Sequence, residues 1–165
     1  MKKSLLALAA LGVFAGAAMA QSSVTLYGLI DENVGKDIGS TAKRISQGAS
    51  SRLGFRGVED LGGGMQAFFQ IEHRFTPWNG QNNPGTVSGV AGKTFWQARS
   101  YVGLRGGFGD VRVGREYNAA FFHGEVVADP WGWDTVAAQT GITGGGVTQV
   151  NVNRSITYTS PNPTG

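Results

Sequence analysis

The chain contains no cysteine and only two histidines among its 165 residues. The absence of cysteine excludes a disulfide-stabilised scaffold and zinc sites built from thiolates. Charged residues make up only 15% of the sequence, and after residue 20 no apolar run is long enough for a membrane-spanning helix. If the protein enters a membrane, it must therefore do so with β-strands.

The first 20 residues, MKKSLLALAALGVFAGAAMA, have the layout of a secretory signal peptide. Lys2 and Lys3 form the positive start, an apolar stretch follows, and Ala18-Met19-Ala20 supplies the small-x-small cleavage pattern. We therefore expect export, cleavage after Ala20 and a mature region 21–165. Without the two lysines, twelve Lys and Arg residues face eleven Asp and Glu residues, which gives no electrostatic reason to expect a nucleic-acid partner.

Glycine, in contrast, is abundant, with 27 residues. High glycine without a collagen period is typical of a protein with many turns and packed strands. Six segments show alternating polar and apolar residues or a composition rich in β-forming residues. They are residues 24–35, 50–58, 65–75, 95–105, 110–116 and 152–160. Short connections, VEDLGGG and GGFG, alternate with long ones at about 36–49, 76–94 and 117–151. This order predicts an all-β, up-and-down antiparallel meander with short turns at one end of the sheet and long loops at the other.

Polar and apolar side chains alternate along these segments. In SRLGFRG, Leu53 and Phe55 share one face of the predicted strand, while Arg52 and Arg56 share the other. A soluble sheet with one wet face gives the same alternation. Repeated arginines and glutamines on the polar face, segments close to the ~9–11 residues that cross a bilayer, and aromatic residues near strand ends favour a transmembrane β-barrel.

Several longer stretches resemble one known family. They are SSVTLYGLID, SRLGFRGVEDLGGGMQAFFQIE, SYVGLRGGFGDVRVGRE and RSITYTSPNPTG, and together they cover most of the predicted mature region. In this order they resemble the general porins of the Gram-negative outer membrane. The resemblance implies a homotrimer of 16-stranded antiparallel barrels in contact with outer-membrane lipid, with short periplasmic turns, long external loops and passive diffusion of ions and small hydrophilic solutes.

The resemblance also implies a constriction loop at about residues 118–150, because the third external loop of these porins folds into the pore. We expect its acidic side to consist of Glu125, Asp129 and Asp134. We expect the basic side of the pore lining to consist of Arg52, Arg56, Arg74, Arg99 and Arg112. An acidic loop facing arginines across a narrow lumen creates a transverse field, and fixed charges of this kind select among hydrated ions.

No catalytic or metal site is predicted. His73 has the parity of the apolar face near a strand end, and His123 lies in the long loop, so nothing in the spacing brings a serine and an acid to either histidine. The carboxylates are too scattered to suggest a metal site. We therefore expect no enzyme activity, no cofactor and no bound metal.

The length of the chain conflicts with a closed barrel of sixteen strands. At roughly 20 residues per strand and connection, such a barrel needs on the order of 320 residues, whereas 145 remain of the 165 after the first 20. We therefore expect the first six or so strands of a porin, an N-terminal fragment. The alternative is an eight-stranded outer-membrane barrel with a structural or adhesin role, which needs two further strands within residues 117–151.

Overall fold

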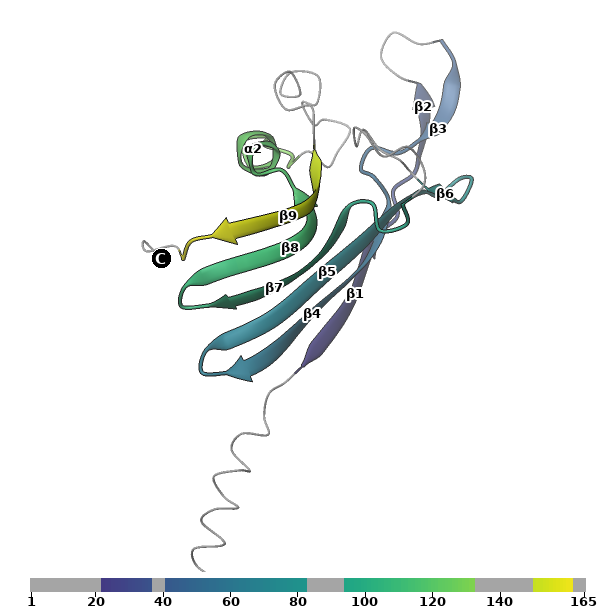
Figure 1. The fold of residues 1–165 in the computed structure, drawn as a ribbon. Coiled ribbons are helices and arrows are strands. Elements are labelled where there is room, and N and C mark those ends of the chain that lie inside the picture. The colour runs from purple at the N-terminus through teal and green to yellow at the C-terminus, as the bar shows by residue number, and fades with distance from the viewer. Residues whose placement is uncertain (1–21, 37–40, 83–93, 133–149, 162–165) are drawn as a thin grey trace, which may run out of the picture.

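Six long strands form one antiparallel meander in the computed structural model, which describes residues 22–36, 41–82, 94–132 and 150–161. In sheet order they are β1 (Ser23–Leu29), β4 (Arg52–Gly62), β5 (Met65–Thr76), β7 (Arg99–Gly106), β8 (Gly109–Tyr117) and β9 (Asn151–Thr159). Each long strand pairs with the next along the chain, as Figure 1 shows. The predicted all-β antiparallel fold class is confirmed. In the described part of the chain, no helix has the length and apolar character to cross a membrane.

The remaining elements lie in the long connections. The strands β2 (Asn33–Lys36) and β3 (Lys43–Ser46) form a separate hairpin between β1 and β4, and β6 (Gln81–Asn82) pairs with the end of β5. After β8 come the short helix α2 (Ala119–Phe121) and the π-helical turn η1 (Phe122–Val126). Figure 1 shows these long connections at one end of the sheet and the tight turns at the other.

Two predicted strand boundaries are wrong. The first strand ends at Leu29, and not near residue 35, because the chain turns to begin the β2–β3 hairpin at Asn33. The strand predicted from residue 95 begins only at Arg99, because the segment before it bends, with the Gln97 amide donating to the Phe95 carbonyl at 3.0 Å.

The turn predicted at VEDLGGG is much shorter than that segment. Strand β4 continues to Gly62, and only Gly63 and Gly64 form the turn, both with positive φ. The Asp60 side chain accepts a hydrogen bond from the Gly62 amide at 2.8 Å, and the register shifts between these two residues. A bulge thus absorbs residues that the glycine-rich composition assigned to the loop.

Three glycines in the sheet lie directly under aromatic rings of the neighbouring strand. Gly54 pairs with Tyr27, Gly57 with Phe69, and Gly103 with Phe68. At each position a Cβ atom would collide with the partner's ring. The rings therefore lie across the glycines, an arrangement that fills the space left by a missing side chain in a curved sheet.

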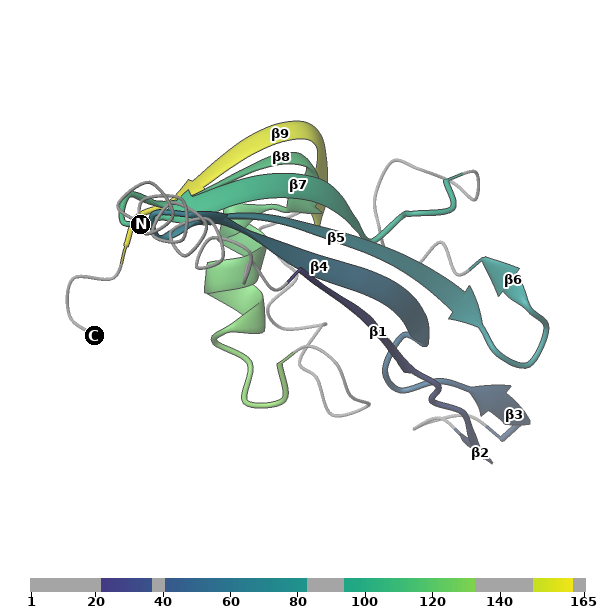
Figure 2. The ribbon, with the colours of Figure 1, turned by 90° about the horizontal axis from the view of Figure 1, so that it is seen from below.

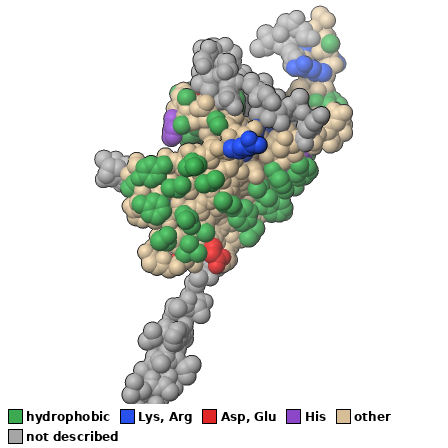
Figure 3. All heavy atoms as spheres, in the orientation of Figure 1, with side chains coloured by type: hydrophobic (Ala, Val, Ile, Leu, Met, Phe, Trp, Pro, Cys, Tyr) green, Lys and Arg blue, Asp and Glu red, His purple; other side chains and the backbone are tan. Residues whose placement is uncertain are grey.

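The sheet has one exposed apolar face and almost no conventional core. Among the described residues the buried hydrophobic side chains are only Ala49, Ala98, Tyr101 and Phe121. The exposed apolar side chains include Val24 (69% exposed), Val102 (61%), Val113 (50%) and Ile156 (77%). Figure 3 shows this apolar area spread over the strands. A continuous apolar surface of this kind is typical of a contact with membrane or protein, and not of the wet face of a soluble sheet.

The opposite face is concave. Figure 2, seen from below, shows the sheet arching over the helical segment that follows β8. Arg56, Arg99, Arg105 and Arg112 line one hollow together with Phe122, so the segment that begins at Asn118 and contains η1 enters the space that these arginines line.

Candidate functional site

The concave face carries a polar surface assembled from alternate positions of neighbouring strands. The register places Arg56 opposite Gln70, Gln70 opposite Tyr101, and Glu72 opposite Arg99, so these side chains share one face. Arg56, Gln70, Arg99 and Tyr101 border a hollow of about 480 Å³ whose polar lining also includes Thr25, Arg105, Asp110 and Arg112. We call this surface the arginine wall.

A ladder of hydroxyl and amide groups ties β1, β5 and β7 together on the arginine wall. The Tyr27 hydroxyl donates to Glu72 Oε2 at 3.0 Å and accepts from Gln70 Nε2 at 2.6 Å. The Tyr101 hydroxyl donates to Gln70 Oε1 at 2.8 Å. Because each group has a partner on another strand, the ladder fixes the positions of the charged side chains beside it.

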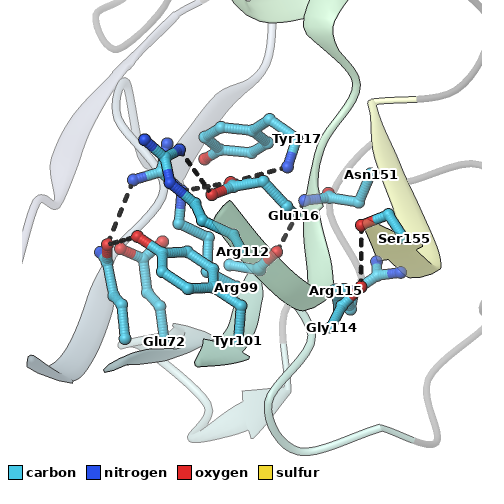
Figure 4. A network of polar contacts seen from close by, with 12 residues as sticks. Glu72, Arg99, Tyr101, Arg112, Gly114, Arg115, Glu116, Tyr117, Asn151 and Ser155 are labelled. Atoms are coloured by element: carbon cyan, nitrogen blue, oxygen red, sulfur yellow. Dashed lines mark hydrogen bonds and ion pairs between the residues drawn. The ribbon is translucent and has the colours of Figure 1, made fainter. Parts of the chain in front are cut away.

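Glu116 is the centre of an ion-pair cluster on β7 and β8. Its side chain is 4% exposed and contacts Arg99 Nε at 3.1 Å and Arg112 Nη1 at 3.2 Å. Arg112 Nε also lies 3.0 Å from Asp110 Oδ1. Figure 4 shows Glu116 between the arginines, with Arg115 on the other side of the strand. Two of the arginines predicted for the pore lining are therefore compensated by carboxylates of the same wall.

A third arginine, Arg74, is compensated in a similar way. Its Nε lies 3.3 Å from Glu72 Oε1, and its Nη2 donates to the Tyr117 hydroxyl at 2.6 Å. The Tyr117 ring lies under the Arg99 guanidinium, 4.3 Å from the ring centroid. Tyr117 thus links the charged cluster to the end of β8, where the loop begins.

Two other arginines of the wall, Arg56 and Arg105, contact neutral groups. The Arg56 guanidinium is exposed and lies 5.8 Å from the Tyr27 ring centroid. Arg105 donates to Gln66 Oε1 at 2.7 Å and lies 5.4 Å from the Phe68 ring centroid. Within the described ranges, neither of them forms a salt bridge with a carboxylate. Arg52 lies opposite Arg74 in the register, at the end of β4 nearest the long connections.

The start of the predicted constriction loop packs against the arginine wall. The Asn118 side chain caps α2 by accepting from the Ala120 amide at 2.9 Å. The Tyr117 ring packs against Phe121, with ring centroids 5.5 Å apart, and Phe122 lies 5.9 Å from the Arg99 guanidinium. Aromatic packing and a helix cap therefore hold this segment on the concave side of the sheet.

Two of the three acids predicted for the loop are nearly buried. Glu125 and Asp129 are both 5% exposed and lie within or just after η1. Asp129 Oδ1 accepts from the Trp131 amide at 2.9 Å, and Glu125 Oε2 has no hydrogen-bond partner among the described residues. Asp134 lies outside the described residues. The ion pairs seen on the wall come from Glu72, Asp110 and Glu116, none of which was among the predicted site residues.

The two histidines lie in different environments. His73 is buried, its Nδ1 lies 2.6 Å from the Phe95 carbonyl oxygen, and its ring stacks on Phe95 with centroids 4.0 Å apart. His123 is exposed in η1. The part of the chain that the structure describes contains no group of three His, Cys, Asp or Glu residues that could hold a metal ion.

A family model described as Gram-negative porin matches residues 7–165. This chain belongs to the Gram-negative porin family. The porin is 46% identical to outer membrane porin protein 32 of Delftia acidovorans over 70% of this chain and 32% of that protein. It is 34% identical to an outer membrane porin of Bordetella pertussis over 100% of this chain and 46% of that protein.

A solved structure agrees with the family. The anion-selective porin from Comamonas acidovorans superimposes with a TM-score of 0.64 at 32% identity, covering 86% of this chain and 43% of that one. Major outer membrane protein P.IB of Neisseria meningitidis is also similar, 38% identical over 79% of this chain. The porin chain described here spans about a third to a half of the length of these relatives.

Proposed function

We propose that the complete protein forms a water-filled channel in the outer membrane of a Gram-negative bacterium, and that it has no enzyme activity. The observation that carries the proposal is the two-faced sheet. Its convex face exposes apolar side chains such as Val24 and Ile156, while its concave face carries the arginine wall. An apolar exterior with a polar interior is the arrangement of a channel-forming barrel. Ions and small hydrophilic solutes then diffuse passively along the concave face.

The proposed channel prefers anions. In the cluster, Arg74, Arg99 and Arg112 face the carboxylates of Glu72, Asp110 and Glu116, so their charges largely cancel. The excess positive charge of the wall then comes from Arg56 and Arg105, which form no salt bridge with the described residues. A relative of known structure is named an anion-selective porin, which supports the same sign. Fixed lumen charges of one sign raise the local concentration of the opposite ion.

Both predicted groups of site residues belong to this proposal. Arg52, Arg56, Arg74, Arg99 and Arg112 form the basic side of the pore lining, and Glu125, Asp129 and Asp134 belong to the constriction loop at about 118–150. The position of α2 and η1 under the arch of the sheet supports a loop that narrows the lumen. The carboxylates of the wall add a second acidic set, which partly neutralises the basic side.

The same proposal includes the assembly and export of the protein. Residues 1–20 are a signal peptide cleaved after Ala20, and residues 21–165 are the N-terminal part of the barrel domain. The complete protein is a homotrimer whose convex surfaces contact membrane lipid or neighbouring subunits. The exposed apolar area of Figure 3 supports such contacts.

Planar-bilayer recording of the complete protein tests the proposal. We expect stepwise conductance increments and, in a salt gradient, a reversal potential of the sign that indicates anion preference. Absence of conductance from correctly folded protein would refute the channel. Conductance with cation preference would leave the channel intact and refute the assignment of excess positive charge to the wall.

A further inference from the structure

The bulge between β8 and β9 gathers two arginines on the convex side of the sheet. Gly114 pairs with Ser155 and Glu116 pairs with Val152, so Arg115 alone faces two residues, Asn153 and Arg154. Arg154 has a φ of 53°, a left-handed conformation that is unusual for a residue other than glycine. Gly114, Arg115, Asn153 and Arg154 line a shallow hollow that opens to the surface.

Arg115 brings a positive charge to this hollow without a carboxylate to balance it. Its side chain donates from Nε to the Gln97 carbonyl and from Nη1 to Asn153 Oδ1, both at 2.6 Å. The residue is 8% exposed, and its Nη2 has no hydrogen-bond partner among the described residues. In the same ranges neither Arg115 nor Arg154 forms a salt bridge. A nearly buried guanidinium with only neutral partners favours an anion nearby.

The surroundings of the hollow resemble a membrane interface. The Trp96 ring, one residue before Gln97, packs edge-on against Phe95 and Phe55 with centroids 4.8 and 6.2 Å apart. Aromatic clusters of this kind lie at the level of lipid headgroups in membrane barrels. Figure 3 shows the visible basic side chains above the apolar area, toward the end of the sheet with the long connections.

An apolar groove lies on the same face. It has a volume of about 560 Å³, and its lining includes Val102, Leu104, Val111 and Val113. Val113 comes two residues before Arg115 on β8, a distance of roughly 7 Å along a strand. The two hollows therefore follow one another along the strand, the charged one toward the long connections and the apolar one toward the tight turns.

We propose that Arg115 and Arg154 bind the phosphate group of a membrane lipid whose acyl chain lies along this groove. Arg154 is exposed and supplies the direct charge-assisted hydrogen bonds, while Arg115 adds the second positive charge behind it. The apolar groove favours a lipid over free phosphate, because free phosphate gains nothing from an apolar surface. Basic pockets beside apolar surfaces are a known means of lipid headgroup recognition.

Native mass spectrometry of the complete porin in neutral detergent tests this site. Three additions are compared, namely phosphatidic acid, diacylglycerol with the same acyl chains, and inorganic phosphate. The main variant is Arg154→Asn, because asparagine tolerates a left-handed φ and folding is preserved. Arg56→Gln is the matched control, because it removes the same charge from the concave face.

We expect phosphatidic acid to remain bound to the unmodified porin and to bind about tenfold more weakly to Arg154→Asn, the loss typical of one charge-assisted contact. Arg56→Gln should bind phosphatidic acid like the unmodified porin, and diacylglycerol should bind weakly to all three. Equal phosphatidic acid binding by Arg154→Asn and the unmodified porin would overturn the proposal. So would diacylglycerol binding as strong as that of phosphatidic acid, or displacement of bound phosphatidic acid by equimolar inorganic phosphate. The readout does not depend on conductance, so this site and the channel function can fail separately.

Discussion

Replacing Arg56 by glutamine should weaken the anion preference of the channel without destabilising the fold. Arg56 is exposed on the concave face, and its guanidinium lies 5.8 Å from the centroid of the Tyr27 ring. Glutamine keeps much of the length and polarity of the side chain and removes its charge. Since Arg56 has no carboxylate partner among the described residues, no buried charge is left uncompensated by the change.

The size of the effect follows from the loss of one unit charge beside the ion path. In water, a charge about 7 Å from a permeating ion changes the energy of that ion by about 0.6 kcal/mol. Screening in about 0.1 M salt, where the Debye length is about 10 Å, halves this to about 0.3 kcal/mol. The loss acts with opposite sign on anions and cations, so the anion-to-cation permeability ratio should fall about threefold.

The assay is the reversal potential of the complete protein in a planar bilayer, measured under a salt gradient at low and at high mean concentration. At about 1 M salt the Debye length is about 3 Å, so the difference between Arg56→Gln and the unmodified channel should almost vanish. Lys43→Gln is the matched control, because it removes a charge from the separate β2–β3 hairpin. An unchanged reversal potential at low salt would remove Arg56 from the selectivity wall, and a shift that persists at high salt would refute the electrostatic explanation.

Two further predictions concern the cluster and the tight turn. Glu116→Gln should shift the reversal potential toward anion preference, because it leaves the charges of Arg99 and Arg112 without their carboxylate partner. It should also lower the free energy of unfolding by about 3 kcal/mol, measured by urea titration. A shift toward cation preference would contradict the charge assignment. Gly109→Ala should lower the free energy of unfolding by at least about 2 kcal/mol, measured by urea titration. The reason is that Gly109 has a φ of 100° and that a Cβ there would meet the Thr159 carbonyl oxygen. Gly107→Ala, in the same turn, has nothing within 4 Å of the added carbon and should have little effect; equal losses in both variants would refute the steric argument.

The period-2 alternation was enough to predict the fold class, the number of long strands and the assignment of side chains to two faces. A strand places successive side chains on opposite sides, so Arg52 and Arg56 had to share a face whatever the register. The order of short and long connections was predictable for a similar reason, because GGFG can only form a tight turn. These features depend on local backbone geometry, which follows directly from the order of residue types in the sequence.

The charge pairing was not predictable to the same degree. It depends on register, which decides that Glu72 lies opposite Arg99, and on a bulge that changes the alternation near the end of β8. Within GDVRVGREY, Arg112 was predicted to line the pore, but Asp110 and Glu116 were not identified as its partners. The strand ends were uncertain because Asp60 stabilises a bulge inside a glycine-rich segment that reads as a loop.

Ion selectivity and the shape of the lumen depend on the arginines of the wall in different ways. Selectivity depends on the net charge that a passing ion experiences, to which every arginine and every carboxylate of the wall contributes, paired or not. The shape of the lumen depends on the pairs themselves, because Glu116 holds Arg99 and Arg112 against the wall and Tyr117 orders Arg74 and Arg99. A substitution in the cluster therefore alters both properties at once. A substitution at Arg56 alters selectivity alone, which makes this exposed residue the more informative probe of the channel.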